Sequence, residues 1–223
     1  MTRETIQFPN GRTAEAIHVA KKSFAKEIIE EMRVPAPEGL ICLNGGTAKL
    51  DESLKKGLTN LLVDGLARVV CEKYYTVLTG GTDAGVFALF GHGIQSWHTR
   101  PPIVVGVAPE ECVKWPRGGV GDTPLEPHHT HFVLVEGRDW GDETPTMYAL
   151  AAEWSRACSS VAIFAGGGAI TLNEMQANVK AARQMIFLEG SGRSTDAVLQ
   201  ARVGKGDHTE TIREIARRGK STS

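Results

Sequence analysis

Short apolar runs alternate with stretches of helical periodicity from Gly39 onward. The runs are rich in Val, Ile, Leu and Phe, and this alternation is typical of βα units stacked on a parallel sheet. Six strands are predicted, at Leu40–Leu43, Tyr75–Thr79, Ile103–Val107, Phe132–Val135, Val161–Ala165 and Met185–Leu188. The predicted fold class is α/β, with an open, mostly parallel sheet flanked by helices.

Four helices are predicted between these strands, at Glu52–Cys71, Ala84–Gln95, Pro145–Ala157 and Leu172–Arg183. In the first helix, apolar residues recur at three- and four-residue steps and should face the sheet. This stripe comprises Leu54, Leu58, Leu61, Leu62, Gly65, Leu66 and Val69. The stretch Ala108–His131 is rich in Pro and Gly and lacks periodicity, so we expect a long loop over the functional edge of the sheet that acts as a lid.

The pattern divides the chain into three parts. Residues 1–38 contain the helix-like run AKKSFAKEIIEEM and the Pro-rich break VPAPEG, and we interpret them as a lead-in packed on the main domain. Residues 39–203 form the predicted α/β domain. Residues 204–223 are mildly basic and predict a short helix or tail.

Composition narrows the classes of function. With 25 Lys and Arg against 26 Asp and Glu among 223 residues, the overall charge favours neither nucleic acid nor an anionic membrane surface. The N-terminus has no apolar signal region, and no run of about 18 apolar residues is present. The four cysteines are widely spaced without a C-x-x-C motif, which fits a reducing compartment. We therefore expect a cytoplasmic protein.

Glycine-rich turns follow four of the six predicted strands. In an open parallel sheet, ligands bind outside the carboxyl ends of the strands, where glycine lets the backbone approach and helix N-termini offer unpaired N–H groups. The first two turns supply the candidates Gly45, Gly46, Thr47 and Lys49, then Gly80, Gly81, Thr82 and Asp83. The last two supply Gly166, Gly167, Gly168, Thr171 and Glu174, then Gly190, Ser191, Gly192 and Arg193. Together they predict a cradle for phosphate; the alternative is that these glycines only make tight turns.

Two further groups have alternative interpretations. In PHHTH (127–131), His129 and His131 should project from one face of a strand and are candidates for ligand contact. His128, His129 and His131 could also bind a metal, but the linear sequence shows no complete site, and no cofactor is expected. Trp140 is placed either to stack on a base or to pack in the protein.

The ordered blocks NGGTAKLDE, TGGTDAGVFAL, HTHFVLVEG, WGDE, FAGGGAITLNEM and FLEGSGRSTDAV resemble the SLOG superfamily. The branch most similar is the one found in TRP melastatin channel N-terminal regions and in stand-alone prokaryotic proteins. This resemblance implies a Rossmann-like fold and a nucleotide-derived ligand related to ADP-ribose. It marks as pocket candidates Gly45, Gly46, Thr47, Lys49, Gly80, Gly81, Thr82, Asp83, Gly190, Ser191, Gly192 and Arg193.

A more distant resemblance concerns catalysis. GGAITLNE (167–174) is similar to the P-G-G-x-G-T-x-x-E motif of the LOG phosphoribohydrolases, and it retains Thr171 and Glu174. In that family the glutamate helps to cleave an N-glycosidic bond. Ile170 replaces a glycine of the motif, and we expect it to reshape the loop.

Three functions follow from these observations. The favoured one is a non-catalytic sensor of an ADP-ribose-like nucleotide. The alternative is a hydrolase that cleaves an N-glycosidic or phosphate linkage with Glu174 as its catalytic residue. A third is an interaction protein whose glycines only make turns. A homodimer is compatible with the fold, and the sequence does not identify an effector protein.

Overall fold

The computed structural model describes residues 1–46, 52–97 and 101–219. One large sheet organises the chain, with eight strands in the order β1-β2-β9-β5-β4-β3-β10-β11. All neighbouring strands are parallel except β1 and β2. In that order the strands are Thr2–Gln7, Thr13–Val19, His131–Val135, Val104–Pro109, Thr76–Thr79, Gly39–Gly45, Ser159–Ala165 and Gln184–Phe187. The predicted α/β, Rossmann-like fold is confirmed, and all six predicted strands are present.

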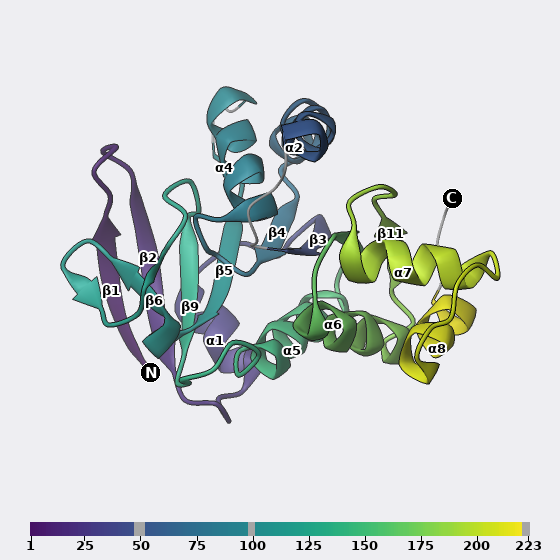
Figure 1. Ribbon diagram of the computed structural model, residues 1–223. Coiled ribbons are helices and arrows are strands. Elements are labelled where there is room, and N and C mark those ends of the chain that lie inside the picture. Colours follow the sequence, from purple (N-terminus) through teal and green to yellow (C-terminus); the bar gives the residue numbers. More distant parts are fainter. Residues whose placement is uncertain (47–51, 98–100, 220–223) are drawn as a thin grey trace.

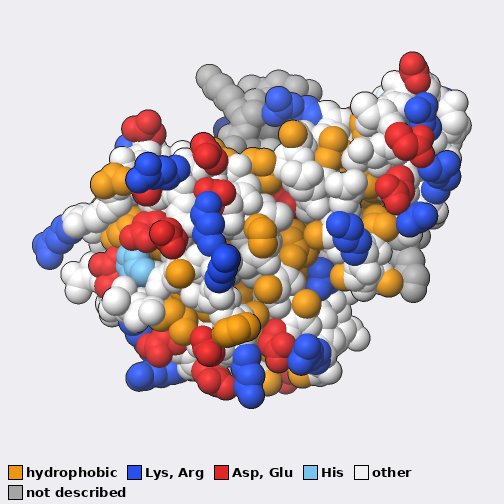
Figure 2. Space-filling model, turned by 90° about the horizontal axis from the view of Figure 1, so that it is seen from below, with side chains coloured by type: hydrophobic (Ala, Val, Ile, Leu, Met, Phe, Trp, Pro, Cys, Tyr) orange, Lys and Arg blue, Asp and Glu red, His pale blue; other side chains and the backbone are white. Residues whose placement is uncertain are grey.

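Helices cover both faces of the sheet (Figure 1). On one face lie α2 (Glu52–Thr59), the π-helix η1 (Asn60–Ala67), α3 (Arg68–Lys73) and α4 (Gly85–Trp97). On the other lie α1 (Ala25–Met32), α5 (Thr144–Trp154) and α6 (Ala169–Lys180), and the chain ends in α7 (Arg193–Arg202) and α8 (Glu210–Arg218). Acidic and basic side chains are interspersed on the face shown in Figure 2. No helix of the described residues is long and apolar enough to cross a membrane.

The order of the strands creates a switch point beside β3. From β3 the chain adds β4, β5 and β9 on one side, then returns across the opposite face through α5 to place β10 on the other side of β3. The loops after β3 and β10 therefore leave the sheet in opposite directions. In doubly wound folds such a point, at the carboxyl ends of the strands, is where ligands bind.

The first helical stretch departs from the predicted stripe. Leu58 and Leu62 are buried as expected, but Leu61 and Val69 are 51% and 42% exposed. The middle of this stretch is the π-helix η1, in which each turn contains more residues than in an α-helix. Positions chosen by α-helical spacing therefore rotate away from the sheet, and the prediction for Leu61 and Val69 is wrong.

Residues 1–38 do more than lead into the domain. Strands β1 and β2 extend the sheet, since β2 pairs in parallel with β9. The hairpin between them turns at Asn10 and Gly11, where Gly11 has a φ of +82°. Asn-Gly between two strands is a strong hairpin signal. The predicted strands began only at Leu40 and therefore missed this hairpin.

The stretch Ala108–His131 is also structured. It contains a 3-10 turn, η2 (Glu110–Cys112), and a small sheet of β6 (Val113–Trp115), β7 (Gly118–Gly119) and β8 (Thr123–Pro124). Val113 and Leu125 pack with Phe132 in a third hydrophobic cluster, apart from the clusters on the two faces of the main sheet. The expectation of a loop without regular structure is therefore wrong.

Gly106 of β5 gives a test of this packing. A Cβ atom at Gly106 would lie 2.5 Å from Gly81 Cα and 2.8 Å from the Phe132 ring. We expect Gly106→Ala to lower the free energy of unfolding by about 1–3 kcal/mol, because a packed interior resists added volume. Urea denaturation measures this. Gly57→Ala in α2 is the matched control, because nothing lies within 4 Å of its Cβ position; an equal loss there would contradict the packing argument.

Candidate functional site

A cavity of about 470 Å³ opens at the switch point. We call it the main cavity, and loops that follow β3, β4, β9, β10 and β11 all contribute to its wall. Its lining residues are Gly45, Gly46, Gly80, Thr82, Phe87, Trp140, Glu143, Gly168, Ala169, Ile170, Thr171, Glu174 and Arg193. Its volume falls in the range of pockets that hold small ligands, about 300–1,000 Å³. None of the lining residues belongs to 108–131, so the predicted lid does not border this cavity.

The loop after β10 forms the floor of the cavity. Gly166 and Gly167 have φ values of +66° and +87°, which favour glycine. A Cβ atom at Gly167 would collide with Thr171, so the turn packs directly on the first turn of α6. Leu172 donates the first hydrogen bond within that helix, to Gly168 O at 3.1 Å. The preceding helical amides have no acceptor in the helix, and they lie on the cavity wall as an anion-binding end.

The loop after β11 holds this floor in place. The Ser194 and Thr195 amides donate to the carbonyls of Gly167 and Gly166, at 3.3 and 3.1 Å. The Gly166 amide in turn donates to Ser191 Oγ at 2.8 Å. The Ser194 and Thr195 hydroxyls also donate, to the Gly168 and Gly166 carbonyls at 3.2 and 2.8 Å. Five hydrogen bonds therefore join the two loops, and the first amides of α7 bond to the protein itself.

This arrangement changes the expected role of the fourth turn. Gly190 and Gly192 donate their amides to the Asp196 carboxylate, each at 3.0 Å. The buried Ser191 hydroxyl donates to Leu188 O. These groups, expected to hold phosphate, have internal partners and do not line the main cavity. Their observed role is to shape the loop.

Arg193 is the part of that turn that reaches the cavity. It begins α7 with a φ of +52°, an uncommon conformation for a residue with a side chain. Its exposed side chain lines the cavity, and no hydrogen bond or ion pair joins it to another described residue. A guanidinium group in this position is free to bind an anionic ligand.

The second turn divides between the cavity and the interior. Gly80 and Thr82 line the cavity, whereas Gly81, with a φ of +71°, packs on Gly106. Thr82 is 1% exposed, and its hydroxyl has no hydrogen-bond partner among the described residues. Because a buried hydroxyl without a partner is costly, Thr82 Oγ1 is poised for a ligand atom. Asp83 points elsewhere and lines a different cavity.

The first turn contributes its two glycines. Gly45 and Gly46 line the cavity, and a Cβ atom at Gly45 would collide with the Ala165 carbonyl. The loops after β3 and β10 thus approach each other closely, as their hydrogen bond from the Gly46 amide to Ala165 O shows. Thr47 and Lys49, the other candidates of this turn, lie outside the described residues.

Two carboxyl groups line the same cavity. Glu174 lies on α6, and burial together with the nearby Glu143 raises its pKa to about 8, although Thr171 offsets part of this shift. Burial also raises the pKa of Glu143, whose Oε2 accepts a hydrogen bond of 2.7 Å from the Gly141 amide. At neutral pH Glu174 is therefore protonated and can donate a proton. Glu143 was not among the sequence candidates, although its WGDE segment follows a strand as the glycine turns do.

Apolar side chains complete the wall. Phe87, Trp140 and Ile170 line the cavity, and Trp140 is 42% exposed, so its ring is accessible to a planar group. Ile170 is the second residue of α6 and has no left-handed φ. This position therefore does not need the backbone freedom of glycine. Whether Ile170 reshapes the loop relative to the LOG enzymes stays a prediction.

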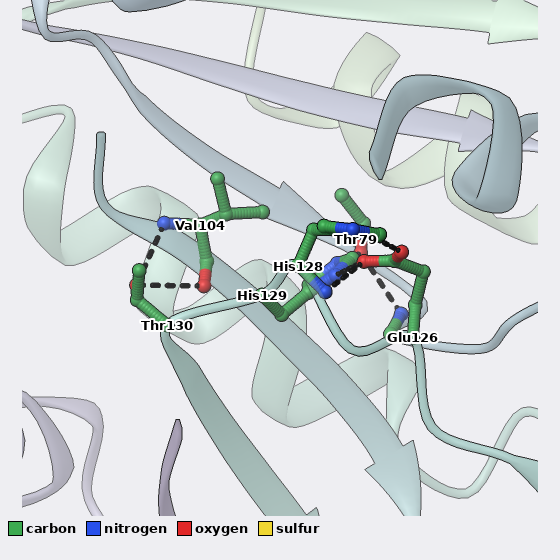
Figure 3. Close-up of polar contacts among 7 residues, drawn as sticks. Thr79, Val104, Glu126, His128, His129 and Thr130 are labelled. Atoms are coloured by element: carbon green, nitrogen blue, oxygen red, sulfur yellow. Dashed lines mark hydrogen bonds and ion pairs between the residues drawn. The ribbon is translucent and has the colours of Figure 1, made fainter. Parts of the chain in front are cut away.

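The histidines form a buried network instead of lining the main cavity (Figure 3). Glu126 accepts from His128 Nδ1 at 2.5 Å and from His129 Nδ1 at 2.8 Å, and His129 Nε2 lies 2.6 Å from Thr79 Oγ1. Thr79 also accepts the Gly81 amide, at 2.8 Å. Burial would raise the pKa of Glu126, but its two histidine partners outweigh this and lower it to about 2. The ionised carboxylate thereby fixes the turn before β9.

His129 and His131 were both expected to contact a ligand, but the structure places them apart. His129 is buried in the network, whereas His131 begins β9 and pairs in register with Glu15 and Val105 near the amino ends of the strands. The two side chains do not meet at one site. Among the described residues, no group of His, Cys, Asp and Glu has the arrangement of a metal site.

The Glu174 carboxyl group should make stability depend on pH. Its folded-state pKa of about 8 exceeds the ordinary value of 4.5, so the folded protein retains a proton that the unfolded chain loses between these values. The free energy of unfolding should therefore fall as pH rises through this window. Glu174→Gln cannot ionise and should lose less stability between pH 5 and pH 9 in urea denaturation. Glu189→Gln is the control, because Glu189 is exposed to solvent; parallel curves for wild type and Glu174→Gln would contradict the assignment.

Comparisons with known proteins identify the family and the fold. The family model described as "SLOG in TRPM, prokaryote" matches residues 38–221. Among solved structures, the chain is similar to the X-ray structure of TM1055, a structural genomics target, with a TM-score of 0.55 and 21% identity over 82% of this chain and 92% of that one. That similarity shows a shared fold. No curated protein matches the sequence. The chain belongs to the prokaryotic family of SLOG domains related to those of TRPM channels.

Proposed function

We propose that the main cavity binds a phosphate-bearing, nucleotide-derived ligand of the ADP-ribose type. One observation carries the proposal: unpaired hydrogen-bond donors converge on this cavity at the switch point of the sheet. They are the buried Thr82 hydroxyl, the amides at the start of α6 and the Arg193 guanidinium group, none of which has a hydrogen-bond partner among the described residues. Anionic oxygen atoms satisfy all three kinds of donor.

The polarity of the wall suggests how such a ligand lies. Phosphate oxygens fit the α6 amides and Arg193, where the positive charge is. The ionisable Glu143 and Glu174 suit the hydroxyl groups of a ribose, since a second anionic group beside them would be repelled. The exposed ring of Trp140 offers a surface for a base. Membership of the SLOG family supports a nucleotide-related ligand.

A thermal-shift series with ADP-ribose, cyclic ADP-ribose, NAD, AMP and ADP tests the binding proposal. A ligand that binds the folded state at about 100 times its Kd should add about 2.7 kcal/mol and raise Tm by several degrees. Arg193→Gln should weaken the Kd of the best ligand about tenfold or more, because a charge-assisted hydrogen bond contributes about 1.5–3 kcal/mol. Thr82→Val should weaken it several-fold.

Arg156→Gln is the matched control for charge, because Arg156 does not line the main cavity. Its Kd should equal that of the wild type. If no compound of the series shifts Tm, or if Arg193→Gln and Arg156→Gln weaken binding equally, the phosphate cradle is not where we place it.

The carboxyl pair favours a second candidate, hydrolysis of an N-glycosidic bond. A protonated Glu174 beside Glu143 gives an acid and a potential base on one wall. In such a reaction the C1′–N bond breaks, Glu174 gives its proton to the leaving base, and water adds at C1′ while Glu143 takes the water proton. The products are the free base and the ribose phosphate.

Chromatography of the protein with AMP and ADP-ribose separates binding from hydrolysis. If the second candidate holds, free base should appear, and Glu174→Gln should retain binding but lower the rate about 10²-fold or more. The rate should also fall as pH rises above about 8, because the acid loses its proton. Intact ligand after binding would leave the sensor as the function; a Glu174→Gln variant with the wild-type rate would remove this residue from any catalysis.

A further inference from the structure

A second cavity, of about 460 Å³, lies beyond the turn that follows β4. We call it the Trp115 cavity, and it shares no lining residue with the main cavity. The tip of the β1–β2 hairpin, strand β6, the segment after β8 and Asp83 surround it. Its lining residues are Phe8, Pro9, Asn10, Asp83, Lys114, Trp115, Pro116, Pro124, Leu125 and Pro127.

The walls of this cavity are held by the fold. Phe8 packs on Phe132, with ring centroids 6.2 Å apart, and donates its amide to Arg12 O across the hairpin at 2.8 Å. Leu125 is buried and donates its amide to Lys114 O at 3.0 Å. Proline at four lining positions restricts the backbone further. The cavity is therefore formed before any ligand arrives, which lowers the cost of binding.

The chemistry of the wall is apolar with two opposite charges. Phe8, Trp115, Leu125 and the prolines provide the apolar surface, and aromatic rings favour a planar partner. Asp83 and Lys114 stand exposed at the rim. In the part of the chain that the structure describes, neither side chain takes part in a hydrogen bond or an ion pair.

The backbone explains why these two charges do not meet. Pro124 lies between them, because Asp83 N donates to Pro124 O at 2.8 Å and Pro124 pairs with Lys114 across β8 and β6. Neighbouring hydrogen-bonded backbone segments lie about 5 Å apart, so two such steps separate the Asp83 and Lys114 backbones by about 10 Å. The gap leaves room for the charged groups of a small ligand. Burial and the Glu126 carboxylate raise the pKa of Asp83, against the nearby His92, His128 and His129, so a ligand cation there would favour the ionised acid.

We propose that the Trp115 cavity binds a free amino acid with an aromatic side chain. The ligand ring lies against Trp115 and Phe8, its ammonium group binds Asp83, and its carboxylate binds Lys114. A zwitterion can pair with both rim charges at once, whereas a simple ion pairs with one of them and an apolar molecule with neither. The site is independent of the nucleotide proposal, because the two cavities share no residue.

Isothermal titration with L-phenylalanine tests this proposal, with phenethylamine and 3-phenylpropionate as ligands that each lack one charge. We expect L-phenylalanine to bind at least tenfold more tightly than either. Asp83→Asn should weaken L-phenylalanine at least tenfold and leave 3-phenylpropionate unchanged. Lys114→Met should weaken L-phenylalanine to a similar degree and leave phenethylamine unchanged. Lys205→Met, an exposed lysine outside the cavity, should change neither.

Three outcomes overturn the proposal. Equal binding of all three compounds means that the cavity recognises only an apolar ring. No heat and no change in Trp fluorescence with L-phenylalanine, L-tyrosine or L-tryptophan at 10 mM, about the weakest binding such a titration registers, means that amino acids are not its ligands. Tighter binding of adenosine, with the same loss in Asp83→Asn, assigns the cavity to a nucleoside. Unchanged urea denaturation of both variants shows that a lost affinity is not a lost fold.

Discussion

The bonds between the loops after β10 and β11 are the constraint on which the main cavity depends. Ser194 and Thr195 donate to Gly167 and Gly166, and Ser191 accepts from Gly166. Left-handed glycine turns are conformationally free in isolation, so an external clamp is needed to hold one geometry. Once it is held, α6 begins with its free amides on the cavity wall. Glu174, one turn into that helix, is then placed in the cavity.

Polar groups around the main cavity differ in whether the protein itself supplies their hydrogen-bond partners. The protein satisfies the amides of Gly190 and Gly192 internally through Asp196, yet it leaves the buried hydroxyl of Thr82 without a partner. Folded proteins leave few buried polar groups unpaired. Three buried side-chain atoms have no partner among the described residues, and of these only Thr82 Oγ1 belongs to a residue that lines the main cavity; Thr144 Oγ1 and Trp154 Nε1 do not. The contrast separates glycine turns whose polar groups shape the loop from residues that we propose contact the ligand. Glycine content alone does not make this distinction.

The strands and the edge where the site lies were predictable, because buried parallel strands give continuous apolar runs and the turns after them need glycine. The roles of particular residues were not. Leu61 follows α-helical spacing, but a π-helix rotates it to the surface. The Ser191 hydroxyl donates to Leu188 O within its own loop. Glu143 comes from the loop after β9, which has no run of adjacent glycines, and only the return of the chain across the sheet places it near Glu174.

The choice between sensor and hydrolase depends on the protonation state and role of Glu174 more than on the presence of Ile170. Because Ile170 occupies a regular helical position, its side chain does not by itself disable a catalytic loop. A carboxyl group with a pKa of about 8 serves both functions: as a neutral donor it can hold a ligand oxygen, and as an acid it can protonate a leaving group. Hydrolysis needs in addition a water molecule positioned by Glu143. If the proposed ligand binds here, the orientation of its sugar relative to these two carboxyl groups decides between binding alone and hydrolysis.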